Sequence, residues 1–233
     1  MKLISHLLKF LKESRLFLWF FFFISIALIL FAVFLIYWKS PDDYLQGDLV
    51  KIMYIHVPFA WISMILYTSL SLFSLMYLIK KIIFFDVLSK NIAQMLLLSV
   101  VLTLATGSIW GKPAWGTWWV WDARLTSMLI LFFITFSYIL VRSIFNNEEL
   151  AAKIGAITAI VGFLNIPIIK FSVDFWSTLH QKSTFLKSGG PSIHSSMVYP
   201  TIIMFFGIMI LISITIASKI KLEILEKKLK RAN

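Results

Sequence analysis

The feature that most constrains the fold is a set of six long stretches without Asp, Glu, Lys or Arg. They are Leu16–Trp38, Ile52–Ile79, Asn91–Gly111, Leu125–Val141, Ile154–Ile169 and Ser188–Ser218. A helix needs roughly 20 apolar residues to cross a bilayer, with about 17 to 25 tolerated. Apolar residues make up 60% of the chain and charged residues only 14%, far from the usage of soluble domains. The chain is therefore predicted to be an all-α integral membrane protein, one six-span domain over residues 1–233.

Lys and Arg are distributed unequally between the two ends of the expected helices. Fifteen lie on the side of the two termini and seven on the opposite side, namely Lys39, Lys51, Lys112, Arg124, Lys170, Lys182 and Lys187. Because segments rich in Lys and Arg remain in the cytoplasm, both termini are predicted to be cytoplasmic, or on the matrix side in an organelle. The first apolar stretch is too long for a cleavable signal peptide. The basic residues form no continuous stripe, which argues against a nucleic-acid partner.

Several kinds of chemistry are excluded by what the sequence lacks. The chain has no cysteine, so thiolate ligation and covalent haem attachment through a C-x-x-C-H motif are impossible. It has no phosphate-binding loop of the Walker type, so any ATP-driven step belongs to a partner. The uncharged stretches also lack the ionisable residues that ion-coupled transporters place near the bilayer midplane, which disfavours ion-coupled transport.

Tryptophan is concentrated between the third and fourth expected spans. Five of the nine tryptophans fall within twelve residues: Trp110, Trp115, Trp118, Trp119 and Trp121. Their spacing fits no single helical face, and we expect them to form a Trp-rich outer loop that binds a large flat ligand. Gly111 and Gly116 are expected to let the backbone approach that ligand. The alternative is an aromatic belt at the membrane interface.

Two charged residues follow this cluster. Asp122 is expected either to contribute to the ligand site or to cap the helix that begins near Leu125. Arg124 has a planar guanidinium suited to a ligand carboxylate. Its alternative role is an ion pair with Asp122.

Histidines are the candidate metal ligands on the same side of the membrane. His56 lies at the start of the second span and His180 in the last outer segment. Without cysteine, neutral imidazole is the natural ligand for haem iron, and one histidine on each side of the macrocycle would give six-coordinate iron. Each histidine could instead be a hydrogen-bonded structural residue. His194 is expected to be a loop residue, and His6 lies on the inner side.

These motifs together resemble a known family. The string from Trp110 to Ser127 resembles the tryptophan-rich WWD signature of haem-handling proteins in cytochrome c maturation. The His-Val-Pro-Phe-Ala-Trp sequence at 56–61 and Thr-Leu-His-Gln at 178–181 are similar to the CcmC family in particular. That family often has tryptophan where this chain has Phe175, and the replacement keeps an aromatic ring.

The resemblance implies a function. Haem b would be held non-covalently, with His56 and His180 as axial ligands, and presented to the haem chaperone CcmE. CcmA and CcmB, with the small CcmD subunit, would be the other partners, and ATP used by CcmA and CcmB would release the loaded chaperone. The membrane would be the bacterial inner membrane, or the mitochondrial inner membrane for an organelle-encoded chain. The protein would not be an enzyme. A small-solute permease, for which Asn165 and Pro167 are a modest indication, and a structural subunit without haem remain the alternatives.

Overall fold

The structure is a computed structural model that describes residues 2–44, 46–181, 184–185 and 189–232. Lys182, Lys187 and Ser188, which entered the sequence predictions, lie outside these residues. The helices are α1 (Lys2–Trp38), the short 3₁₀ helix η1 (Asp48–Ile52), α2 (Met53–Lys80), α3 (Ile83–Trp115), α4 (Ala123–Ile144), α5 (Glu148–Gly162), α6 (Asn165–Phe175) and α7 (Ser195–Ala232).

Within the described residues, six helical segments are long and apolar enough to cross a membrane. They are Arg15–Trp38, Asp48–Lys80, Ile83–Trp115, Ala123–Ile144, Glu148–Phe175 and Ser195–Lys227. The prediction of an all-α protein with six spans is confirmed. The helices extend past the uncharged stretches because a helix satisfies its backbone hydrogen bonds internally whether its side chains are charged or not.

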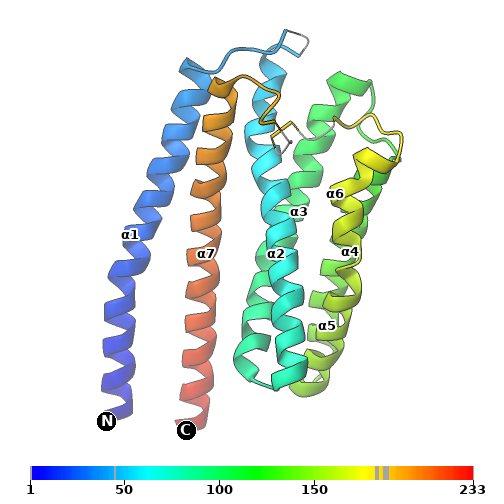
Figure 1. Cartoon of the computed structure of the whole chain (residues 1–233). Coiled ribbons are helices and arrows are strands. Elements are labelled where there is room, and N and C mark those ends of the chain that lie inside the picture. Colours follow the sequence, from blue (N-terminus) through cyan, green and yellow to red (C-terminus); the bar gives the residue numbers. More distant parts are fainter. Residues whose placement is uncertain (1, 45, 182–183, 186–188, 233) are drawn as a thin grey trace.

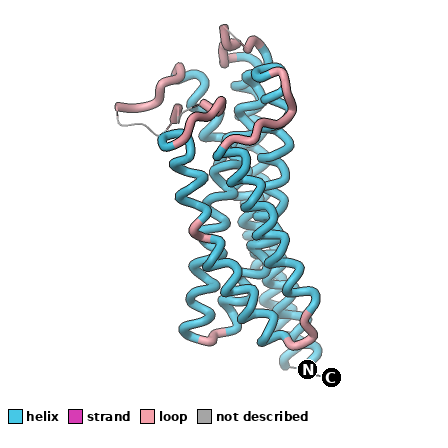
Figure 2. The backbone as a smooth tube through the Cα atoms, turned by 90° about the vertical axis from the view of Figure 1, so that its right-hand side faces the viewer, coloured by secondary structure: helices cyan, strands magenta, loops and turns pink. Residues whose placement is uncertain are grey.

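The helices run roughly parallel and place the two termini at the same end (Figure 1). Helix α1 packs against α7, while α2 packs against α3, α5 and α7. Figure 2 shows that loops at the other end connect the helices above the bundle. The tryptophans of the cluster and the histidines His56, His180 and His194 lie toward this loop end, which the connecting segments α1–α2, α3–α4 and α6–α7 share.

The fifth span is broken into two helices, α5 and α6, where the sequence indicated one stretch over residues 154–169. Pro167 has no backbone N–H, and the Phe163 carbonyl accepts from Ile166 at 3.0 Å instead. The N–H groups of Phe163 and Leu164 donate to carbonyls three residues earlier, at 3.1 and 3.3 Å. The break is therefore a tightened turn rather than an open segment of backbone.

Neighbouring helices satisfy the polar groups at this break. The Ala159 carbonyl accepts from two hydroxyls of α2, those of Tyr67 at 3.1 Å and Ser71 at 2.9 Å. The Asn165 side chain donates to the Ser127 carbonyl of α4 at 2.8 Å. Irregular backbone at membrane depth is tolerated only where protein or water satisfies it, and here protein does so.

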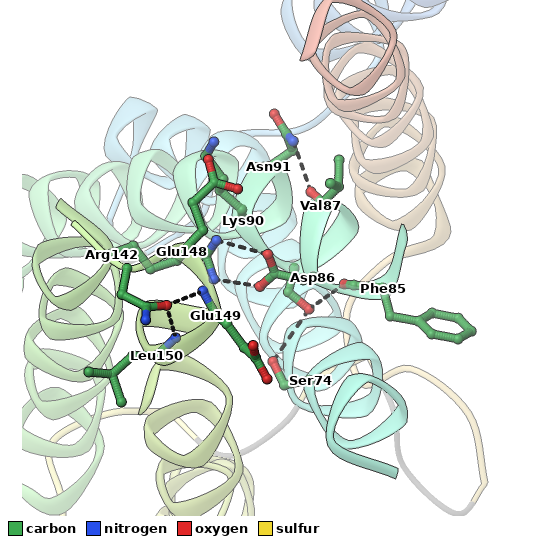
Figure 3. A network of polar contacts seen from close by, with 12 residues as sticks. Ser74, Phe85, Asp86, Val87, Lys90, Asn91, Arg142, Glu148, Glu149 and Leu150 are labelled. Carbon is green, nitrogen blue, oxygen red and sulfur yellow. Dashed lines mark hydrogen bonds and ion pairs between the residues drawn. The ribbon is translucent and has the colours of Figure 1, made fainter. Parts of the chain in front are cut away.

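A polar network joins the helices at the end that carries the termini. Arg142 of α4 forms an ion pair with the buried carboxylate of Asp86 on α3, and its second nitrogen donates at 2.9 Å (Figure 3). Glu223 of α7 accepts from Asn91 at 3.0 Å and from Lys90 at 3.1 Å, both on α3. These contacts attach α4 and α7 to α3 far from the loop end.

We predict that Gly162→Ala destabilises the bundle, because a Cβ there would lie 2.0 Å from the Tyr67 hydroxyl oxygen and 2.5 Å from Ile134. Overpacking of this kind costs about 1–3 kcal/mol. Thermal unfolding in detergent should show a lower Tm. The double variant Gly162→Ala with Tyr67→Phe should recover part of the loss, since it removes the overlapping oxygen while Ser71 still donates to Ala159. An unchanged Tm in the single variant would contradict this packing.

Candidate functional site

A cavity of about 200 Å³ opens at the loop end between α2, α3, α4 and α6. Six residues predicted from the sequence line it: His56, Trp110, Trp115, Trp119, Arg124 and His180. Deeper in the bundle its walls are apolar, formed by Val57, Ala60, Met64, Leu104 and Met128. The cavity therefore combines a polar rim at the loops with a hydrophobic floor.

His56 projects from the first turns of α2 against α3. A Cβ on Gly107 would lie 2.9 Å from the His56 Cε1 atom, so the imidazole packs where only glycine leaves room. Its Nδ1 is 3.1 Å from the Thr106 hydroxyl, which itself donates to the Leu102 carbonyl at 2.6 Å. Because that hydroxyl has one proton and donates it to the carbonyl, Nδ1–H of His56 is the donor to Thr106. The Nε2 lone pair of His56 is then available for a ligand.

His180 lies in the segment after α6. Its Nδ1 is 3.0 Å from the Gln181 carbonyl, which can only accept, so Nδ1 again carries the proton and Nε2 the lone pair. Burial against the cavity, followed by the nearby Arg124 cation, lowers the pKa of His180 below its ordinary value. A lowered pKa favours the neutral imidazole, which is the form that binds metals.

The two imidazoles converge although they come from opposite halves of the chain. Their ring centroids are 6.4 Å apart, and the ring planes are inclined by 37°. Each ring also has a tryptophan neighbour: Trp110 lies 5.8 Å from His56, and Trp115 lies 6.4 Å from His180. The site therefore presents two converging imidazoles within an aromatic wall.

His194 differs from this pair in position and in tautomer. It is exposed in the segment before α7 and does not line the cavity. The backbone N–H of Ser196 donates to its Nδ1 at 3.3 Å, so His194 carries its proton on Nε2. His6 lies in α1, at the end of the bundle that carries the termini.

The tryptophan cluster is divided between a helix and a loop. Helix α3 continues through Trp115 and ends at Gly116, which has a φ of +74° and donates to the Lys112 carbonyl at 2.9 Å. The expected Trp-rich loop over all five tryptophans is thus not observed, because Trp110 and Trp115 belong to α3. The loop begins only after Gly116, which ends the helix in a left-handed cap. At Gly111 it is the Trp115 ring, not a ligand, that packs against the backbone. The ring lies 2.8 Å from where a Cβ of residue 111 would be.

The remaining tryptophans face in two directions. Trp119 lines the cavity, and its buried indole N–H has no hydrogen-bond partner among the described residues. Trp118 and Trp121 do not line the cavity and are 56% and 76% exposed. Unlike the Trp119 indole, the Trp110 indole N–H has a partner and donates to the Gln46 side chain at 2.7 Å. The cluster therefore has a cavity-lining part and an outward part.

Asp122 and Arg124 have separate partners. An Asp122 oxygen accepts from the Leu125 N–H at 2.8 Å, so the expected helix cap is confirmed. Its other oxygen accepts from the Thr178 hydroxyl, and Asp122 does not line the cavity. The Arg124 guanidinium donates to the Ser172 hydroxyl at 3.2 Å and to carbonyls of α6 at 3.3 and 3.4 Å. No ion pair joins Asp122 to Arg124 in the part of the chain that the structure describes.

Reasoning from the sequence missed three residues that contact the histidines of the site: Thr106, Gly107 and Thr178. Thr106 and Gly107 lie within an apolar stretch in which nothing marks them as neighbours of His56. Thr178 stands two residues before His180, within the Thr-Leu-His-Gln motif, and that spacing was the available signal. Their roles depend on contacts between helices that are distant in sequence.

The sequence also matches known proteins. A sequence model of the family described as Heme exporter protein C matches residues 3–233. Heme exporter protein C of Bradyrhizobium diazoefficiens is 41% identical over 82% of this chain and 73% of its own length. The protein of the same name from Haemophilus influenzae is 40% identical over 82% and 78%. A cytochrome c biosynthesis ccmC-like mitochondrial protein of Marchantia polymorpha is 44% identical over 75% and 73%.

The hydrogen bonds predict opposite tautomers for the histidines of this end. In protein labelled with ¹⁵N-histidine at neutral pH, His56 and His180 should show a protonated Nδ1 and an unprotonated Nε2, while His194 shows the reverse. ¹⁵N NMR chemical shifts, assigned with His→Ala variants, measure this directly. A protonated Nε2 on His56 or His180 would contradict the assignment.

Proposed function

The chain belongs to the Heme exporter protein C family, and from that premise we propose that it binds haem b non-covalently in this cavity. In this proposal His56 and His180 are the axial ligands of the iron. The observation that carries it is the pair of imidazoles 6.4 Å apart, each with its Nδ1 proton directed at an acceptor and its Nε2 left for the iron. Orienting the second nitrogen in this way is how proteins prepare histidine as a metal ligand.

The cavity walls suit an amphipathic macrocycle. Val57, Ala60 and Leu104 offer an apolar surface for the vinyl side, while Trp115 and Trp119 offer flat faces near the rim. The cavity of about 200 Å³ is smaller than the about 300–1,000 Å³ that encloses a drug-sized ligand. A haem would accordingly lie only partly inside, leaving an edge exposed for transfer.

Arg124 is the proposed anchor for a haem propionate. It lines the cavity, and its guanidinium forms no ion pair with a carboxylate of the described residues. Its contacts with α6 use Nε and Nη2 and hold the group in place. A half-buried cation in this position favours a ligand with a carboxylate.

The proposed role is binding and presentation rather than turnover. Haem would pass to the chaperone CcmE, while CcmA and CcmB supply the ATP-driven step that this chain has no motif for, with CcmD as a further subunit. Trp118 and Trp121, exposed beside the cavity, are the proposed contact for the chaperone.

The charge distribution supports the proposed orientation in the membrane. With fifteen of 22 Lys and Arg on the side of the termini, we place the cavity at the outer face of a bacterial or mitochondrial inner membrane. For the alternative of a small-solute permease, the break between α5 and α6 would be the natural solute site. At this break the Ala159 carbonyl accepts from Tyr67 and Ser71, and the Asn165 side chain donates to the Ser127 carbonyl. These bonds favour a structural role for the break.

The histidine ligands can be tested by haem content. His56→Ala and His180→Ala should each weaken haem binding by more than the about 10–100-fold that loss of an outer-shell partner costs. The purified variants should lose or shift the low-spin bis-imidazole absorption of the Soret and visible bands. His194→Ala is the matched control and should retain the wild-type spectrum. Normal haem content in both ligand variants would refute this function.

The two parts of the tryptophan cluster should separate in function. Trp115→Ala with Trp119→Ala should weaken haem retention about 10-fold, since each lost ring contact is worth about 0.5–1.5 kcal/mol. Trp118→Ala with Trp121→Ala should retain haem and slow its transfer to purified CcmE. Unchanged transfer in the second pair would assign those rings to the membrane interface.

A further inference from the structure

The aspartate that follows the tryptophans has two partners, one for each carboxylate oxygen. Oδ1 accepts from the Leu125 backbone N–H at 2.8 Å and caps α4. Oδ2 accepts from the hydroxyl of Thr178, a residue of the segment that follows α6. Asp122 is 8% exposed and belongs to the α3–α4 connection. One buried side chain thus joins the start of α4 to the segment that carries His180.

The hydrogen bonds continue from Thr178 to His180. The Thr178 hydroxyl accepts from the His180 backbone N–H at 3.0 Å. Because its one proton is directed to the Asp122 carboxylate, a lone pair remains for that N–H. The series therefore runs in one direction, from the His180 N–H to Thr178 and from the Thr178 hydroxyl to Asp122.

This connection matters because His180 has no helix to hold it. His56 is fixed by α2 and by Gly107 beneath its ring, whereas His180 lies beyond the end of α6 at Phe175. Further along the chain from His180, the Phe185 ring packs edge-on against Trp61 of α2, with ring centroids 5.2 Å apart. The position of the His180 ring opposite His56 thus depends on anchors outside His180 itself.

We propose that Asp122 and Thr178 are positioning residues that hold His180 at the distance and angle needed for it to face His56. The proposal rests on the proposed function, in which His180 ligates haem iron. In this proposal Asp122, which directly follows the tryptophan cluster, acts by positioning His180 and does not contact the ligand. Asp122 and Thr178 are both absent from the cavity lining, as a role of this kind requires.

The test uses substitutions that separate positioning from folding. Thr178→Val keeps the branched shape and removes the hydroxyl, while Thr178→Ser restores the hydroxyl. Asp122→Ser retains an N-cap oxygen for α4 but removes Oδ2, the second carboxylate oxygen, which accepts from Thr178. Thr158→Val is the matched control, since the Thr158 hydroxyl donates to the Ile154 carbonyl in α5, away from the cavity.

Each full-length variant is purified in detergent and titrated with ferric haem, and the low-spin fraction is read from the EPR and visible spectra. Thr178→Val and Asp122→Ser should lower haem affinity about 10-fold or more and convert part of the bound haem to a high-spin form, as loss of an outer-shell partner does. Thr178→Ser and Thr158→Val should match the wild type.

The outcomes distinguish this proposal from the function on which it rests. Wild-type spectra and affinity in Thr178→Val and Asp122→Ser, with His180→Ala still disrupting the low-spin signal, would overturn the positioning role and leave the haem site intact. Loss of haem in Thr178→Val that Thr178→Ser does not restore would also overturn it. An unchanged low-spin signal in His180→Ala would remove the ligand assignment itself, and the positioning role with it.

Discussion

In a bilayer, backbone N–H and C=O groups must find hydrogen-bond partners within the protein, and this constraint determines where a site can form. Six spans satisfy it as helices. At the break between α5 and α6, the Ala159 carbonyl satisfies it by accepting from Tyr67 and Ser71 of α2. Irregular backbone that can shape a ligand site is therefore found chiefly in the connections at the loop end. His180 and Trp119 lie in these connections, whereas His56, Trp110 and Trp115 project from the adjoining ends of α2 and α3.

At the loop end, a rigidly held histidine is paired with one held by a loop. His56 lies on a helix, its ring against Gly107 and its Nδ1 against Thr106. His180 depends on Gln181 for its tautomer and on Thr178 for its backbone position. In the proposed function, a fixed ligand opposite a loop-borne one suits a protein that both holds a cargo and releases it. The open edge of the cavity and the exposed rings of Trp118 and Trp121 suit transfer to a partner in the same way.

Much of this could be predicted from the sequence, because its signals are local. Uncharged stretches identified the six spans, and Asp122 before Leu125 identified a helix cap. Other features depend on contacts between distant segments. The continuation of α3 through Trp115 was not expected, because the five tryptophans were predicted to share one loop. Gly116 supplies the end of the helix.

The partners of Asp122 and His56 illustrate the same limit. No local pattern links Asp122 to Thr178 or His56 to Gly107, because these pairs meet only when α2, α3 and the α6–α7 segment have packed together. The division of the tryptophans into cavity-lining and outward rings has the same origin. Composition predicted an aromatic surface, but only the packing of α3 against α2 and α4 assigns each ring a side.

The central claim is that one haem iron is bound by two histidines, one from α2 and one from the segment after α6. Pulsed EPR of the ferric haem complex, prepared with ¹⁵N-histidine, measures the histidine nitrogens bound to iron directly. The account predicts hyperfine coupling to two imidazole nitrogens in the wild type, and to one after either His56→Ala or His180→Ala. A wild-type complex with one coupled imidazole or none would contradict it.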